Sequence, residues 1–305
     1  MLRSSPFYGI AALLALLSGC TPSRTPQAEE ESPTRGTVEL LCDDAIADIL
    51  TEPLRRFDSL FPDAQVTLRA VPAREAMRQL LARTARLVVL ARGYLPDEDS
   101  LMRAFGVPAH PNVALAEDAL VFFVHPKFPL DTLNVEQLRA VLSGRARLCE
   151  LFPQLRSEPE WVCPSTASSV YAHLVLQVLG GRPPRIPLRL VSQSDSVQLL
   201  VEQSPNRIGI GYLSHIARRT NVKALELGFT DSTGAYVSPK PVHQAYVVLR
   251  KYPYIVPIQA YLRDDLRNLP WTVATFLGTD AEVQRYFRDI GIVPAFAQIR
   301  LIPEE

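Results

Sequence analysis

The segment "AEDALVFFVHPKFPLDTLNVEQLRAVLSG", residues 116–144, decides the fold class of this chain. Its first half contains an unbroken apolar run, Ala119–Val124, which is typical of a buried strand. Its second half, residues 134–144, has apolar residues at helical spacing and stops at Gly144, a residue type that often ends helices. A buried strand followed directly by a helix predicts an α/β fold.

The same alternation continues on both sides of this segment. Upstream strands are predicted at residues 36–44, 64–71 and 86–93, with a helix after each. The third of them, "RLVVLARG", is almost continuously apolar, as strands of a buried parallel sheet are. Downstream, residues 188–216 predict strand, helix and strand, residues 244–254 a strand, and residues 271–291 two helical segments. The whole pattern predicts an α/β fold with a parallel sheet.

Length and charge narrow the class of protein. A chain of 305 residues fits one large domain or two medium ones, and its 47% hydrophobic content is enough for a sizeable core. The formal net charge is zero, so the chain lacks the basic footprint of a nucleic-acid-binding protein. We therefore expect no nucleic acid among its partners.

The N-terminal segment "MLRSSPFYGIAALLALLSGC", residues 1–20, has the pattern of an export signal. Arg3 precedes an apolar run that is short for a membrane span, and the run ends in Leu-Ser-Gly-Cys, which resembles a bacterial lipobox. An ordinary cleaved signal peptide or a membrane anchor is the alternative. The small-small-Cys ending favours lipidation of Cys20, which predicts a protein held on the periplasmic side of the cell envelope by its lipid.

Residues 21–35 are rich in Pro, Thr, Ser and Glu and predict a flexible tether, so the folded part should begin near Gly36. Three cysteines follow the tether: Cys42, Cys149 and Cys163. Export permits a disulfide between Cys149 and Cys163, whereas the odd count and the lack of close pairs leave that pairing open.

A cluster of hydroxyl side chains precedes an apolar helical segment in "VCPSTASSVYAHLVLQVLGG", residues 162–181. It contains Ser165, Thr166, Ser168 and Ser169, although one hydroxyl is enough to cap a helix. Several hydroxyls at a helix N-terminus can surround an oxyanion. Arg92 follows the third strand, at the strand end where open α/β sheets bind ligands, and its guanidinium suits a tetrahedral oxyanion.

The order of segments resembles the substrate-binding proteins of bacterial phosphate ABC transporters, of the type II periplasmic binding-protein class. The motifs that carry the resemblance are "EDALVFFVHPKFPLDTLNVEQLRAVLSGR", "SPNRIGIGYL", "KYPYIVPIQAYL" and "FRDIGIVPA". The resemblance implies two α/β lobes, residues 36–117 plus 245–305 and residues 118–244, with the ligand cleft between them. It places the two crossing strands at Ala119–Val124 and Ala245–Leu249.

The resemblance also implies a function. Such a protein captures inorganic phosphate or a similar oxyanion, hands it to ABC permease subunits, needs no cofactor and is a monomer. The ligand loops depart from the family pattern, because the turn at Ser165–Ser169 has lost the family's glycines and arginine. Arg92 would supply the cation, and Asp44 or Asp118 would accept the proton that phosphate still carries.

Simpler interpretations remain open for these residues. Asp43 and Asp44 fit helix caps, Arg92 alone fits a surface arginine, and Gly209 and Gly211 fit close packing in a strand. The five histidines lack metal-ligand spacing, so no metal is expected.

Three functions compete: an oxyanion receptor, a transport-inactive relative that acts as an envelope sensor or assembly partner, and a serine hydrolase using Ser165 or Ser168. The chain has no Gly-x-Ser-x-Gly elbow and no identifiable base, which argues against an enzyme.

Overall fold

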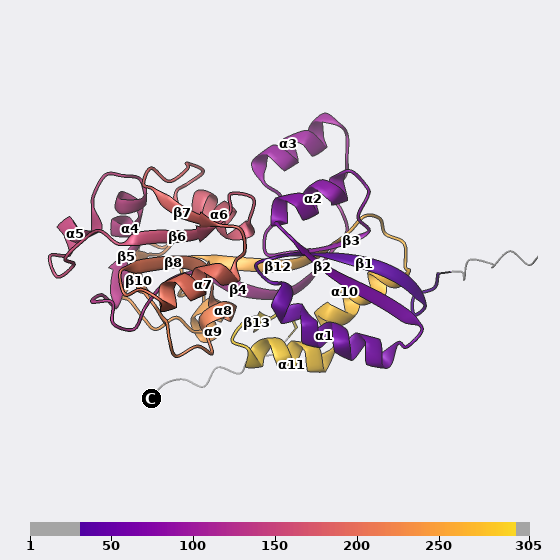
Figure 1. The fold of residues 1–305 in the computed structure, drawn as a ribbon. Coiled ribbons are helices and arrows are strands. Elements are labelled where there is room, and N and C mark those ends of the chain that lie inside the picture. Colours follow the sequence, from indigo (N-terminus) through magenta and orange to yellow (C-terminus); the bar gives the residue numbers. More distant parts are fainter. Residues whose placement is uncertain (1–30, 297–305) are drawn as a thin grey trace, which may run out of the picture. The chain divides into compact units, whose positions relative to one another are not determined.

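The computed structural model describes residues 31–296, and their mixed α/β architecture confirms the predicted fold class (Figure 1). The main sheet runs in the order β2-β1-β3-β12-β4-β8-β6-β7. Its strands are β1 (Gly36–Asp43), β2 (Ala64–Val71), β3 (Leu87–Leu90), β4 (Asn112–Val124), β6 (Glu160–Pro164), β7 (Leu188–Val191), β8 (Arg207–Tyr212) and β12 (Ile255–Leu262). The short strands β9 (Lys223–Ala224) and β13 (Val293–Pro294) join β4, while β5 (Thr132–Asn134), β10 (Glu226–Thr230) and β11 (Tyr236–Val237) form a separate small sheet.

Helices cover the sheet in two groups. One group surrounds β1–β3 and consists of α1 (Ala47–Leu60), α2 (Ala73–Leu81), α3 (Pro96–Ala104), α10 (Leu269–Thr279) and α11 (Ala281–Asp289). The other surrounds β6–β8 and consists of α4 (Val135–Leu142), α5 (Leu148–Leu151), α6 (Ser169–His173), the π-helical turn η1 (Leu174–Val178), α7 (Asp195–Glu202), α8 (Leu213–Ile216) and α9 (Gln244–Val248). We call these groups, with their strands, the first and second lobes.

Strand β4 connects the two lobes. Its N-terminal part, up to Ala119, pairs antiparallel with β12, and Leu120–Val124 pairs antiparallel with β8. The predicted strand Ala119–Val124 is therefore confirmed, although the strand begins earlier, at Asn112. All six residues of that run are buried without solvent exposure, which explains the unbroken apolar sequence.

The second predicted crossing strand, Ala245–Leu249, is wrong. These residues lie in and directly after helix α9, whose first turn is capped by the His243 ring accepting a hydrogen bond from the Ala245 amide at 3.1 Å. Within α9 only Val247 is buried, so the segment does not have the environment of a central strand.

Strand β12 lies beside β4 instead, between β3 and β4. It contains Pro257, and proline in a central strand is unusual because it cannot donate a hydrogen bond to its neighbour. The register with β4 shifts between Ile258 and Gln259, an irregularity of the kind that relieves such positions. The two prolines in "KYPYIVPIQAYL" thus concealed this strand in the sequence.

Close packing explains Gly209 in β8. A Cβ atom there would lie 2.5 Å from the Phe123 ring and 2.9 Å from Val201. The predicted packing role of Gly209 is therefore confirmed.

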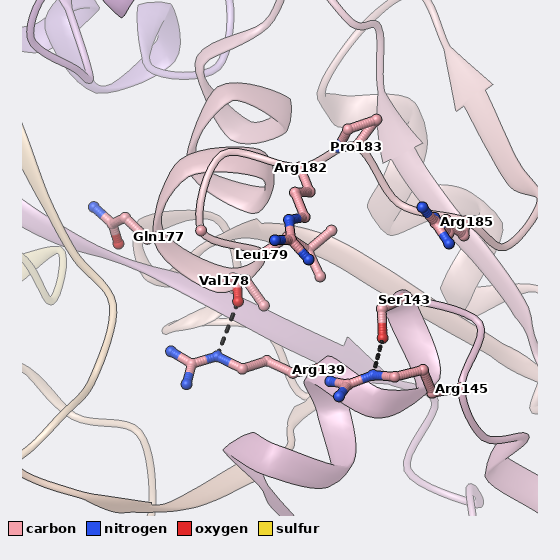
Figure 2. Close-up of a pocket in the computed structure, with 10 residues that line it drawn as sticks. Arg139, Ser143, Arg145, Gln177, Val178, Leu179, Arg182, Pro183 and Arg185 are labelled. Atoms are coloured by element: carbon pink, nitrogen blue, oxygen red, sulfur yellow. Dashed lines mark hydrogen bonds between the residues drawn. The ribbon is translucent and has the colours of Figure 1, made fainter.

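In the second lobe, helix α4 is tied to the π-helical turn η1. The Arg139 side chain donates from Nε to the Val178 carbonyl at 2.9 Å (Figure 2). Because the two segments are far apart in the sequence, this contact fixes one wall of a surface pocket between them.

A hydrogen-bonded ion pair anchors the chain at Glu31, just before β1. The Glu31 carboxylate accepts hydrogen bonds from Arg86 at 2.7 and 2.5 Å, close to the predicted start at Gly36. The predicted signal peptide, most of the predicted tether and Cys20 lie outside the described residues. Within residues 31–296 no helix is long and apolar enough to cross a membrane.

The cysteines Cys42, Cys149 and Cys163 are all free, so the Cys149–Cys163 disulfide is not formed.

Candidate functional site

The loops that follow the parallel strands of both lobes meet at one place. From the first lobe come the end of β1, the start of α2 and the segment after β3; from the second lobe comes the turn between β6 and α6. The Arg74 amide donates to the Ala167 carbonyl at 3.0 Å, and His173 Nε2 donates to the Ala91 carbonyl at 2.6 Å. These bonds hold the two lobes together at the predicted site.

The Asp43 carboxylate lies at the centre of this contact and has no solvent exposure. Its Oδ1 accepts from the Ala45 amide and its Oδ2 from the Ala91 amide, both at 3.2 Å. Burial raises the pKa of Asp43, and the adjacent Ser169 hydroxyl and the two amides oppose that rise. An internal carboxylate thus occupies donors that could otherwise hold the oxygens of a bound anion.

Ser169 connects this carboxylate to the second lobe. The Tyr212 hydroxyl donates to Ser169 Oγ at 2.7 Å, which leaves the Ser169 hydrogen available for Asp43. Ser169 and Tyr212 both have no solvent exposure. The hydrogen-bond chain therefore runs from the end of β8 to the end of β1.

The other hydroxyls of the cluster have different surroundings. Ser168 caps helix α6: its Oγ accepts from the Tyr171 amide at 3.1 Å and donates to the Ser165 carbonyl at 2.7 Å. Ser165 is half-buried and Thr166 is exposed. The prediction that one of the four hydroxyls caps the helix is confirmed, and Ser169 is the member that lies against a charged group of the other lobe.

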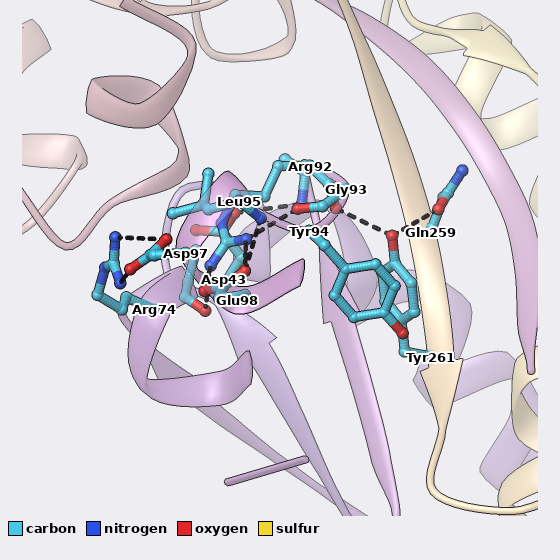
Figure 3. Close-up of polar contacts among 12 residues, drawn as sticks. Asp43, Arg74, Arg92, Gly93, Tyr94, Leu95, Asp97, Glu98, Gln259 and Tyr261 are labelled. Carbon is cyan, nitrogen blue, oxygen red and sulfur yellow. Dashed lines mark hydrogen bonds and ion pairs between the residues drawn. The ribbon is translucent and has the colours of Figure 1, made fainter. Parts of the chain in front are cut away.

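Arg92 is only 2% exposed and is engaged within the first lobe (Figure 3). Its guanidinium forms a two-pronged ion pair with Glu98, at 2.7 and 2.8 Å, and also donates to the Gly93 and Ala73 carbonyls. Glu98 also accepts from the Leu95 amide at 2.8 Å. Glu98 thus already neutralises the charge of Arg92. The counter-charge of an anionic ligand would need to be free of such a partner.

Sequence reasoning missed Glu98. It belongs to the acidic run "PDEDS" at the start of α3, where Asp97, Glu98 and Asp99 look alike. Only the fold separates them, because Asp97 pairs with the exposed Arg74 while Glu98 turns inward to Arg92. An acidic residue six positions after an arginine is too weak a signal to identify the pair.

Asp44 lies beside Asp43 and is half-buried. Burial, and then the neighbouring Asp43 charge, raise the pKa of Asp44 to about 7. Its Oδ2 receives a long hydrogen bond of 3.5 Å from the Ser194 hydroxyl, and its Oδ1 is buried with no partner among residues 31–296. Asp44 therefore has an unused buried acceptor, and so does Asp118, whose Oδ2 is also buried without a partner among residues 31–296.

Asp118 lies in β4, 1% exposed, near the point where the strand passes between the lobes. Its Oδ1 accepts from the Ala119 amide at 2.7 Å and from the Ser214 amide at 3.3 Å, and burial raises its pKa. The neighbouring His215 hydrogen-bonds the Ala45 carbonyl of the first lobe. Asp118 thus belongs to the same contact as Asp43 and Asp44.

Positive charge is scarce around these carboxyls. Burial lowers the pKa of His173 to about 4, so its ring is neutral at pH 7. Among residues 31–296 no group of three or more His, Cys, Asp or Glu side chains is arranged to hold a metal ion. Hydrogen bonds, protonation and the nearby Arg92 guanidinium therefore offset the negative charge of these acids.

An opening leads from the surface toward the hydroxyl turn. A cavity of about 290 Å³ lies between the lobes, and its lining includes Thr166, Tyr171, Leu95 and the ion pair of Arg74 with Asp97. Thr166 is thus the hydroxyl of the cluster that faces this cavity.

Comparisons with known proteins agree with this fold. The model of a periplasmic-binding-protein (PBP) superfamily domain matches residues 27–161. A phosphate-binding protein PstS of Pseudomonas aeruginosa is 26% identical over 125 residues, 41% of this chain and 38% of that protein. The chain therefore spans well under half of the length of the curated relatives that it matches.

Solved structures match over a longer part of the chain. A putative phosphate ABC transporter substrate-binding protein of Clostridium perfringens with bound phosphate has a TM-score of 0.72 at 14% identity, covering 85% of this chain and 99% of that one. An ABC-type phosphate transport receptor of Vibrio cholerae has a TM-score of 0.65 at 15% identity, covering 85% and 100%. At these identities the similarity establishes the two-lobed fold. By their names, these three relatives bind or transport phosphate.

Proposed function

We propose that the chain is an extracytoplasmic solute-binding protein, because a PBP-superfamily model matches residues 27–161 and both sequence and fold resemble phosphate-binding proteins. It captures phosphate or a related oxyanion when its lobes open and delivers the ion to ABC permease subunits. Hinge motion of this type uses a few residues between rigid lobes, and β4 is the strand that passes between them here. We propose the lobe boundaries that the resemblance implied, residues 36–117 plus 245–305 and residues 118–244, except that helix α9 (Gln244–Val248) lies with the second lobe.

One observation carries this proposal: hydrogen-bond donors from both lobes converge on a single buried anionic group. The Ala45 and Ala91 amides belong to the first lobe and the Ser169 hydroxyl belongs to the second. All three donate hydrogen bonds to the Asp43 carboxylate. A ligand oxyanion would satisfy the same donors after the lobes open and close again. Thr166 and Ser165 lie on the same turn, Thr166 at the cavity, and would add further contacts.

The same observation favours a second function. Asp43 occupies the donors and Glu98 neutralises Arg92, so the closed contact forms without a ligand. A chain that closes without a ligand fits a transport-inactive relative that acts as an envelope sensor or assembly partner. Oxyanion binding separates the two functions.

We expect Asp43→Ser to bind oxyanions at least about tenfold more tightly than the wild type, because the ligand no longer competes with the internal carboxylate. Titration calorimetry of the full-length chain with phosphate, arsenate, sulfate and molybdate measures this. Asp48→Ser, which removes an exposed carboxylate from α1, is the matched control and should leave binding unchanged.

Each outcome of the titrations with the four oxyanions decides between the proposed functions. Binding by the wild type supports the receptor. Binding by Asp43→Ser alone supports the transport-inactive relative. If neither protein binds any of the four ions, the oxyanion assignment is wrong, and equal affinities of the two would exclude Asp43 as a competitor.

The anchoring of the protein rests on Cys20. We propose that the mature chain begins at a lipid-modified Cys20 and faces the periplasm, because the lipobox-like sequence follows a short apolar run. Cells supplied with a labelled fatty acid should incorporate label into the wild-type chain and none into Cys20→Ala. Equal labelling of both would contradict the anchor.

A further inference from the structure

A pocket on the second lobe is lined by four arginines and lies outside the contact between the lobes (Figure 2). Its volume is about 510 Å³, within the range of ligand-binding pockets. Arg139 lies on α4 and Arg145 just after it, whereas Arg182 and Arg185 lie on the loop after η1. Two segments distant in the sequence therefore present arginines to one cavity.

The positive charge in this pocket is not balanced by carboxylates. Elsewhere most arginines form ion pairs, as Arg74 does with Asp97 and Arg207 with Glu160. Among residues 31–296, none of the four pocket arginines forms an ion pair, and no acidic residue lines the pocket. In a chain of zero net charge, this local excess is a departure from the rest of the surface.

The pocket is also held in shape. The Nε atom of Arg139 donates to the Val178 carbonyl at 2.9 Å, and that of Arg145 donates to Ser143 Oγ at 2.9 Å. The Arg185 amide donates to the Leu142 carbonyl at 2.9 Å and thereby fixes the loop against the end of α4. The guanidinium of Arg182 extends from the loop toward Arg139 and Arg145 (Figure 2). Val178 ends a π-helical turn, a feature that frequently marks functional sites.

We propose that this pocket binds a ligand that carries two or more phosphate groups. Guanidinium groups pair with phosphate through two parallel hydrogen bonds, and four of them around one cavity match several phosphates rather than one. The volume is large for a single orthophosphate ion. A soluble oligophosphate and the headgroup of a bisphosphate lipid have this chemistry in common. This site does not depend on the ligand of the interlobe contact.

Calorimetry of the full-length chain tests the site, with tripolyphosphate as the soluble probe and a water-soluble short-chain cardiolipin as the lipid probe. We expect the wild type to bind at least one of them. Arg182→Ser with Arg185→Ser should weaken that binding by at least about 100-fold, because two charge-assisted contacts are lost. Raising the salt concentration should weaken it as well.

The matched control is Arg156→Ser with Arg218→Ser. Both residues are exposed and lie outside the pocket, so this pair removes the same charge elsewhere. This control pair should leave the affinity for the two probes within about threefold of the wild-type value, because only a nonspecific charge effect is expected. Orthophosphate binding at the interlobe contact should survive both double substitutions. The proposal is overturned if the wild type binds neither probe, if Arg182→Ser with Arg185→Ser binds as tightly as the wild type, or if both double variants lose affinity equally.

Discussion

Glu98→Ala is expected to lower the free energy of unfolding by about 3–5 kcal/mol, because it leaves the Arg92 guanidinium buried without its partner. Both side chains of the pair are at most 5% exposed, so water cannot replace the lost contact. Denaturant unfolding of the full-length chain measures the change.

Asp97→Ala is the matched control. Asp97 is the neighbouring carboxylate on α3 and pairs with Arg74, but both members of that pair are about half exposed. Its removal should cost less than about 1 kcal/mol. Equal effects of the two substitutions would contradict the structural role of Glu98.

The double variant Arg92→Met with Glu98→Leu separates stability from binding. Replacing both members of a buried pair by apolar residues is often neutral or stabilising, so it should fold. If Arg92 serves only the pair, oxyanion binding is retained. If Arg92 is a ligand for the anion, as its position after β3 indicated, binding is lost while stability is kept.

Asp44→Asn is expected to raise the free energy of unfolding by about 2 kcal/mol at pH 8 and to change it little at pH 4. The pKa of Asp44 is raised to about 7, so the folded state holds a proton that the unfolded state releases near pH 4. Its contribution is therefore complete below about pH 4 and is lost as the pH rises to about 7. The shift corresponds to about 4 kcal/mol, and partial solvent exposure reduces it.

Unfolding curves between pH 4 and pH 8 measure this difference. The contribution of Asp118 occurs in both proteins and cancels in the comparison, whereas the measured difference includes the mutual repulsion of Asp43 and Asp44. Asp48→Asn, an exposed carboxylate on α1, should show no such dependence. A difference between wild type and Asp44→Asn that is constant with pH would contradict the raised pKa.

The sequence by itself determined the fold class and most of the elements near the site. Continuous apolar runs such as Leu87–Leu90 and Ala119–Val124 can only be buried, and helical spacing after each run leaves an α/β arrangement. The hydroxyl turn was placed correctly at the start of α6, with one member as its cap. These features are local, so the order of residues is enough to specify them.

Only the tertiary structure decided which charges meet. The arginine after β3 was identified, but its partner was not, because Glu98 differs from Asp97 and Asp99 only in the direction it faces once α3 is packed. In the same way, the Ala91 amide reaches Asp43 only when β1 and β3 pair side by side, whereas the Ala45 amide is two residues away in the sequence. The crossing strand β12 was missed because the sheet accommodates Pro257 beside a register shift, which local propensity does not predict. Charge pairing and strand partners depend on contacts between residues distant in sequence, and those contacts exist only after folding.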